Sequence, residues 1–131
     1  MRKCLLILLV LSSSANSADS DSGECVTGTI TGLNVGQMGS DKSPSRASDN
    51  LSVRIESNNW NKSQNHIRCD TSTGTQCWIG IKSSSSLGDP QGRVMYDAIK
   101  SAYFLGHEIT LYSHNLSNGK CESFDQVTLL K

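Results

Sequence analysis

The feature that most constrains the fold is one well-delimited helix in a chain whose other regular segments read as strands. Its spacing of apolar residues predicts a helix from Pro90 to Leu105. Asp89 can cap it, because a carboxylate there accepts from free backbone N–H groups of the first turn, and Gly106 suits the left-handed residue that ends many helices. The stripe expected to face the core comprises Val94, Met95, Ala98, Ile99, Ala102 and Leu105.

Alternating apolar and polar residues predict five short strands around this helix. The first, Val26 to Val35, changes phase near its glycines and is expected to bend at a bulge. The others are residues 51–55, a hairpin of 67–69 with 77–81 that is counted as the third strand, residues 108–112 and residues 124–130. Three strands, a helix and two strands are the order of an OB-fold. The predicted class is therefore mainly β with one helix, a five-stranded OB-fold-like barrel with the helix between strands three and four.

The N-terminus has the pattern of a secretory signal peptide. Arg2 and Lys3 precede an apolar run at residues 4–11, and small residues follow at 12–18. The apolar run is too short to span a membrane. We expect cleavage after Ser17 or Ala18, which leaves residues 19–131 as one domain in a secreted or periplasmic protein.

Four cysteines follow the predicted signal peptide: Cys25, Cys69, Cys77 and Cys121. In a small exported domain, four cysteines indicate two disulfides, and three pairings remain open. In the barrel order, the cysteines precede strands that start at the same pole, so all four thiols are expected to gather there. A zinc site formed by His66 with Cys69, Cys77 and Cys121 is the alternative, although this spacing fits no common ligand pattern.

The composition argues against two classes of partner. The chain has 12 basic and 12 acidic residues, so its formal net charge is zero. A nucleic-acid-binding protein normally has a basic face, and so does a protein attracted to an anionic membrane. Aromatic residues make up 5% of the chain, too few for an obvious base-stacking platform. We therefore expect no nucleic-acid partner and no membrane span.

Two blocks of sequence carry a family resemblance. Residues 30–37 end in Gly-Gln, and residues 95–106 continue into 108–112 with Tyr96, Tyr103, Tyr112 and Gly106 in register. These blocks resemble the first strand, the helix and the fourth strand of the subtilase cytotoxin B-subunit family, the glycan-binding pentamers of certain AB5 toxins. In this resemblance, Cys69 and Cys77 correspond to the cysteines that flank the family's second hairpin.

The resemblance implies a ligand site and partners. The family's sugar site uses a serine at the start of the first strand and a tyrosine just past the fourth. Here these positions fall on Val26 or Thr27 and on Ser113, next to Tyr112, so neither family residue is kept. The implied partners are sialylated or other glycans, a toxin A subunit and four further copies in a homopentamer whose helices line a pore.

Trp60 is a further candidate ligand residue, since its ring could stack on a sugar. We favour the alternative that it plugs the end of the core, because tryptophan is highly buried on average.

No arrangement of residues indicates catalysis. His66, His107 and His114 are the histidines, the cysteines are expected in disulfides, and no serine lies in a glycine-framed elbow. We therefore expect a binding protein without cofactor or catalytic residues. Two functions remain open: a glycan-recognition module, and an exported protein-interaction module such as an inhibitor, adaptor or assembly factor.

Overall fold

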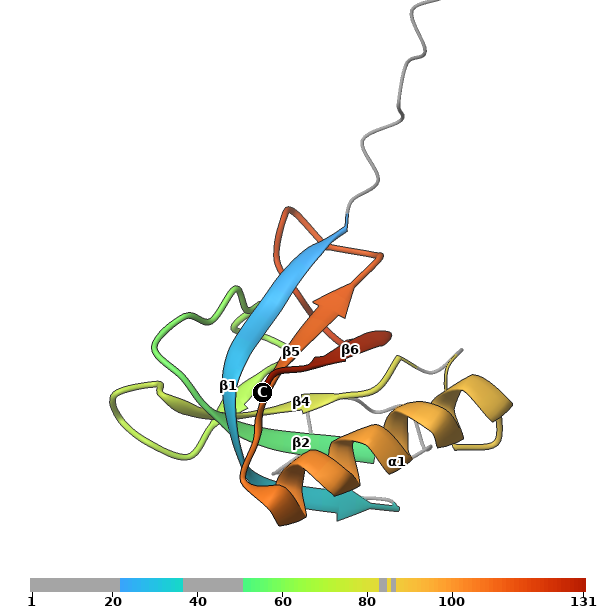
Figure 1. The fold of residues 1–131 in the computed structure, drawn as a ribbon. Coiled ribbons are helices and arrows are strands. Elements are labelled where there is room, and N and C mark those ends of the chain that lie inside the picture. The colour runs from blue at the N-terminus through green and yellow to red at the C-terminus, as the bar shows by residue number, and fades with distance from the viewer. Residues whose placement is uncertain (1–21, 37–50, 83–84, 86) are drawn as a thin grey trace, which may run out of the picture.

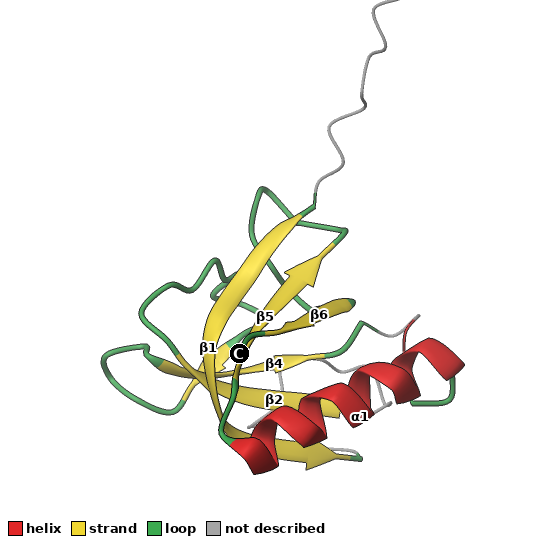
Figure 2. Cartoon of the chain, viewed as in Figure 1, coloured by secondary structure: helices red, strands yellow, loops and turns green. Residues whose placement is uncertain are grey.

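A six-stranded antiparallel sheet with one helix beside it forms the frame of the protein (Figures 1 and 2). The computed structural model describes residues 22–36, 51–82, 85 and 87–131, so the predicted signal peptide lies outside the described residues. The elements are β1 (Gly23–Val35), β2 (Leu51–Glu56), β3 (Arg68–Cys69), β4 (Gln76–Gly80), α1 (Pro90–Leu105), β5 (Glu108–Ser113) and β6 (Gln126–Leu129). The predicted class, mainly β with one helix, is confirmed.

The sheet does not close into a barrel. Its strand order is β3-β4-β2-β1-β5-β6, which leaves β3 and β6 at the edges of the described sheet. One isolated parallel bridge joins the two sides: the Phe124 N–H donates to the Gly80 carbonyl at 3.0 Å, and the Lys82 N–H donates to the Phe124 carbonyl at 2.8 Å. The strand β6 itself begins only at Gln126, later than the predicted strand 124–130.

The long strand β1 bends to pair with both β2 and β5. Its register shifts between Ile30 and Gly32 against β2, and between Glu24 and Val26 against β5. These irregularities confirm the predicted bulge. Gly28 permits the close crossing of β1 and β2, since a Cβ there would lie 2.2 Å from the carbonyl oxygen of Glu56.

Helix α1 has the predicted caps. The carboxylate of Asp89 accepts from the backbone N–H of Gln91 at 2.8 Å, and Gly106 is left-handed with φ of 69°. Past it, the His107 N–H donates to the carbonyl of Ala102 at 3.0 Å. Both ends of the helix therefore form as the sequence predicts.

Only part of the predicted apolar stripe faces the core. Met95, Ile99 and Ala102 are buried where α1 packs against β1, β5 and β6. Val94 and Leu105 are 69% and 67% exposed, so the prediction was wrong for these two residues. They lie roughly 80–100° around the helix axis from Met95, which places them on the flank of α1 beyond the reach of the sheet.

The inner face of the sheet forms the core. Alternation along the strands correctly predicts which residues point inward, since Leu51, Val53, Ile55, Ile109 and Leu111 are fully buried. In the described part of the chain, no helix combines the length and the hydrophobicity needed to cross a membrane.

The four cysteines form two disulfides, as predicted. Cys25 pairs with Cys121, and Cys69 pairs with Cys77. The two bridges lie near one pole. Residues 61 and 63 hydrogen-bond to the backbone of Cys25 and Cys121, and the ammonium of Lys62 between them contacts both sulfurs of the other bridge. Zinc binds thiolates, so the zinc hypothesis does not fit cysteines that are paired.

Candidate functional site

Two of the residues predicted from the family resemblance share the outer face of the sheet. Thr27 of β1 pairs with Thr110 of β5, and Glu24 pairs with Tyr112. Directly paired residues point to the same face. The Thr27 hydroxyl donates to a carboxylate oxygen of Glu24 at 2.6 Å and lies 2.7 Å from the Thr110 hydroxyl. Glu24, Thr27 and Tyr112 thus line a polar strip, which we call the β1–β5 strip.

The other two residues of that prediction point inward. Val26 is fully buried opposite Leu111, and Ser113 is 1% exposed. The Ser113 hydroxyl donates to the carbonyl oxygen of Asn115 at 3.2 Å. The side chains of Val26 and Ser113 are therefore closed to a ligand in solvent, and the predicted set is divided between the two faces of the sheet.

Trp60 packs against the core from the loop after β2. It is half-buried, and its indole N–H donates to the carbonyl oxygen of Thr75 at 3.3 Å. The ammonium of Lys62 lies 5.8 Å from the ring centroid. These contacts agree with the preferred interpretation of Trp60 as a plug at the end of the core.

A second tryptophan has a different setting. Trp78 of β4 pairs with Arg54 of β2 on the outer face, and the guanidinium carbon of Arg54 lies 5.4 Å from the centroid of the Trp78 ring. The indole N–H donates to a carboxylate oxygen of Asp70 at 2.9 Å. The same oxygen lies 3.2 Å from Nη1 of Arg54.

Arg54 is held in place from β1 as well. Its Nε donates to the hydroxyl of Thr31 at 3.1 Å, and Nη2 donates to the carbonyl oxygen of Thr31 at 2.9 Å. A Cβ on Gly32 would lie 3.1 Å from the Trp78 ring, so the indole lies directly against this glycine. We call Thr31, Arg54, Asp70 and Trp78 together the tryptophan surface.

The tryptophan surface combines fixed geometry with solvent access. The side chains of Arg54 and Asp70 are 31% and 42% exposed, and Trp78 is half-buried. An indole offers a flat apolar face, while a guanidinium and a carboxylate offer directed donors and acceptors. Such a surface can stack on a ring and hydrogen-bond the polar groups around it.

Sequence reasoning placed Trp78 within the predicted hairpin and missed Arg54, Asp70 and Trp78 as site residues. Part of the signal was present: Val53 and Ile55 point inward, so Arg54 between them must point outward, and Trp78 likewise lies between the inward Cys77 and Ile79. The pairing of β2 with β4 brings these two residues together. That pairing is a long-range contact with no local sequence signal.

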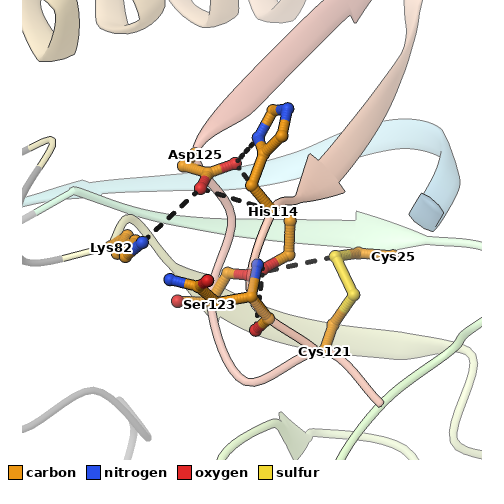
Figure 3. A network of polar contacts seen from close by, with 8 residues as sticks. Cys25, Lys82, His114, Cys121, Ser123 and Asp125 are labelled. Atoms are coloured by element: carbon orange, nitrogen blue, oxygen red, sulfur yellow. Dashed lines mark hydrogen bonds and ion pairs between the residues drawn. A yellow bond between two sulfur atoms is a disulfide. The ribbon is translucent and has the colours of Figure 1, made fainter. Parts of the chain in front are cut away.

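A buried carboxylate organises a second polar cluster, in the loops that follow β4 and β5 (Figure 3). Asp125 is 10% exposed at its side chain and accepts from the backbone N–H of His114 at 3.1 Å. Its carboxylate also lies 2.7 Å from Nδ1 of His114 and 3.9 Å from Nζ of Lys82. Lys82 follows β4, His114 follows β5, and Asp125 precedes β6.

This cluster has a structural explanation. Asp125 ties the ends of β4 and β5 to the start of β6, and its own N–H donates to the carbonyl of Tyr112 at 3.0 Å. The Cys25–Cys121 bridge lies beside it, with Sγ of Cys25 3.9 Å from the carbonyl oxygen of Ser123 (Figure 3). A buried carboxylate with several donors stabilises the loop between β5 and β6. We therefore assign this cluster to the fold.

The fold and the site define a small disulfide-bonded protein with an antiparallel sheet, one helix and a polar outer face that carries a fixed indole. Comparisons with protein-family models, with curated proteins and with solved structures found no match. The family resemblance of the two sequence blocks therefore stays a prediction.

Proposed function

We propose that this protein is an exported glycan-binding module and that the tryptophan surface is its binding site. The observation that supports this proposal is the half-buried indole of Trp78, fixed on the outer sheet face between Arg54 and Asp70. The apolar face of a sugar ring stacks on such an indole. The hydroxyls around the ring match the guanidinium and carboxylate beside it.

The rigidity of the surface favours binding. Trp78, Arg54 and Thr31 lie on three adjacent strands, and their hydrogen bonds fix the side chains before a ligand arrives. Side chains that are already ordered lose less entropy when a ligand binds. The β1–β5 strip on the same sheet face supplies hydroxyl and carboxylate groups for a second sugar residue.

The charges indicate which sugars fit best. Asp70 and Arg54 form an ion pair at 3.2 Å, so their charges compensate each other. A neutral sugar binds without disturbing this pair, whereas the carboxylate of a sialylated glycan competes with Asp70 for Arg54. We propose neutral glycans as the preferred class and sialylated glycans as the weaker one.

The family resemblance extends this proposal. It implies a homopentamer and a toxin A subunit as partner, while the N-terminal pattern implies a protein cleaved after a signal peptide. The single bridge between Ile81 and Phe124 supports a relation to the five-stranded barrel, because it joins the β4 side to the β6 side. We propose the sheet as an open variant of that barrel.

A protein-interaction module is the alternative, and one observation favours it. Phe104 and Leu105 at the end of α1 are 78% and 67% exposed, and the ring centroid of Phe104 lies 5.6 Å from that of the exposed Tyr103. Exposed large apolar residues that lie close together often mark contacts with another protein. This face of α1 would serve an inhibitor, an adaptor or an assembly factor as well as a pentamer.

A glycan array with the purified chain tests the proposal. We expect binding to a neutral glycan, and at least about a tenfold loss of affinity in Trp78→Ala, because an aromatic anchor carries much of the energy of such sites. Tyr103→Ala is the matched control, since it removes an exposed aromatic ring from α1 and leaves the sheet face intact. Asp70→Asn, which frees Arg54, is expected to raise affinity for sialylated glycans.

Three outcomes contradict these proposals. If the chain binds no glycan on the array, the glycan-binding function is wrong. If Tyr103→Ala lowers affinity as much as Trp78→Ala, the site lies elsewhere than the tryptophan surface. Light scattering that shows a monomer contradicts the pentamer.

A further inference from the structure

Lys62 places its ammonium directly on one of the two disulfides. Its Nζ lies 2.9 Å from Sγ of Cys69 and 3.2 Å from Sγ of Cys77. A third contact, at 2.9 Å, is the carbonyl oxygen of Gly74 in the turn between β3 and β4. These three acceptors are uncharged. Burial lowers the pKa of Lys62, because the ammonium has lost part of its hydration.

The Cys69–Cys77 bridge is much more accessible than the Cys25–Cys121 bridge. Cys69 is half-buried at the sheet edge formed by β3, whereas Cys25 and Cys121 are both fully buried. Thiol–disulfide exchange requires that an incoming thiolate reach one sulfur atom. Cys69 is therefore the more accessible cysteine of the two in this bridge, since Cys77 is fully buried.

The hairpin retains other contacts that hold it together. Cys69 and Cys77 are only 8 residues apart and pair directly across β3 and β4. The neighbouring Asp70 N–H donates to the carbonyl of Gln76 at 2.8 Å. Opening this bridge therefore leaves most of the fold in place, whereas the Cys25–Cys121 bridge joins positions 96 residues apart.

We propose that Cys69–Cys77 is a reducible disulfide that exchanges with an external dithiol, and that Lys62 stabilises the thiolate released in this exchange. A thiolate of the dithiol attacks Sγ of Cys69, the bond between Cys69 and Cys77 breaks, and its electron pair stays on Sγ of Cys77. The second thiolate of the dithiol then attacks the dithiol's own sulfur in the mixed disulfide. This closes the disulfide of the dithiol and releases Cys69 as a thiolate. The dithiol is oxidised by two electrons, and its two protons balance the two cysteine thiolates.

Lys62 favours this reaction through charge. A positive group beside a cysteine stabilises the thiolate and makes it a better leaving group. When the bridge opens, the sulfur beside the Lys62 ammonium changes from an uncharged disulfide sulfur to a negatively charged thiolate. The inference stands whether or not the sheet face binds a glycan, although Asp70 and Trp78 directly adjoin the two cysteines.

The experiment measures the reduction of each bridge in the folded, purified chain. Dithiothreitol is added without denaturant, free thiols are alkylated at intervals, and mass spectrometry assigns the alkylated cysteines. We expect Cys69 and Cys77 to react at least about tenfold faster than Cys25 and Cys121. We expect Lys62→Met to slow this reduction about tenfold and Lys62→Arg to retain most of the wild-type rate. Arg68→Gln is the matched control, because it removes a positive charge next to Cys69, whereas the cation that contacts the two sulfurs is Lys62.

Several results would overturn the proposal. Equal reduction rates of the two bridges would show that Cys69–Cys77 has no special lability. Equal slowing by Arg68→Gln and Lys62→Met would show that only the local net charge matters. If Lys62→Met lowers the folded fraction, Lys62→Arg still tests the role of the charge, and a rate about tenfold below that of the wild-type chain in this variant would contradict it.

Discussion

Gly28 shows how a single residue decides the packing of two strands. It lies where β1 crosses β2, and a Cβ at this position would meet the carbonyl oxygen of Glu56 at 2.2 Å. The obstacle is backbone of the central sheet, which cannot move aside without breaking strand pairing. We expect Gly28→Ala to lower the free energy of unfolding by about 2–3 kcal/mol, measured by urea denaturation.

Gly23→Ala is the control for this prediction. Its Cβ would lie 3.1 Å from Cδ1 of Leu116, the far end of a flexible side chain that can rotate away. We expect a change below about 1 kcal/mol for this variant. Equal losses in Gly23→Ala and Gly28→Ala would refute the argument from close strand crossing.

At the scale of elements, α1 forms from local signals that the sequence displays openly. Asp89 accepts from the Gln91 N–H at 2.8 Å, so its removal leaves an N–H of the first turn without this partner. We expect Asp89→Ala to lower the free energy of unfolding by about 1 kcal/mol, measured by thermal or urea unfolding.

Asp97→Ala is the control for this prediction, because it removes a carboxylate from the exposed middle of α1. Asp97 makes a 3.4 Å ion pair with Lys100 at the surface, and such pairs contribute at most about 1 kcal/mol and often far less. A loss in Asp97→Ala as large as in Asp89→Ala would contradict the capping role.

The strands were predictable to a different degree than the helix. Alternation placed β2 and β5 and identified their buried apolar residues, although Ser52, Thr110 and Ser113 on these strands are buried as well. It placed the last strand too early, since Phe124 and Asp125 are buried yet lie outside the ladder with β5. Burial alone therefore does not show whether a residue pairs with a neighbouring strand.

At the scale of the whole molecule, the two disulfides differ in what they stabilise. Cys25–Cys121 joins the start of β1 to the loop before β6, across 96 residues. Closing a loop of that length lowers the entropy of the unfolded chain by an amount worth about 4–5 kcal/mol, against roughly 2.5 kcal/mol for a loop of about eight residues. We expect the double variant Cys25→Ala/Cys121→Ala to lose more stability than Cys69→Ala/Cys77→Ala by about 2 kcal/mol, measured by urea denaturation.

The order of the two losses is the decisive result. If Cys69→Ala/Cys77→Ala is the less stable protein, then the short hairpin bridge contributes more to the stability of the fold than the Cys25–Cys121 bridge does. That outcome would also contradict the proposal that its reduction leaves most of the structure in place.

The sequence by itself determined the local features of this protein. The caps of α1, the bulge in β1 and the inward residues of the strands each depend on residues within a few positions of one another, so their pattern is visible along the chain. It also indicated two disulfides, because four cysteines that follow a predicted signal peptide are expected to pair.

Only the tertiary structure decided which distant residues meet. It selected one cysteine pairing among three, kept the sheet open at β3 and β6, and turned Val26 and Ser113 inward. It also brought Arg54 beside Trp78 and Lys62 onto the Cys69–Cys77 bridge. The physical reason is the same in each case: strand register and loop path place these residues, and both depend on packing across the whole sheet.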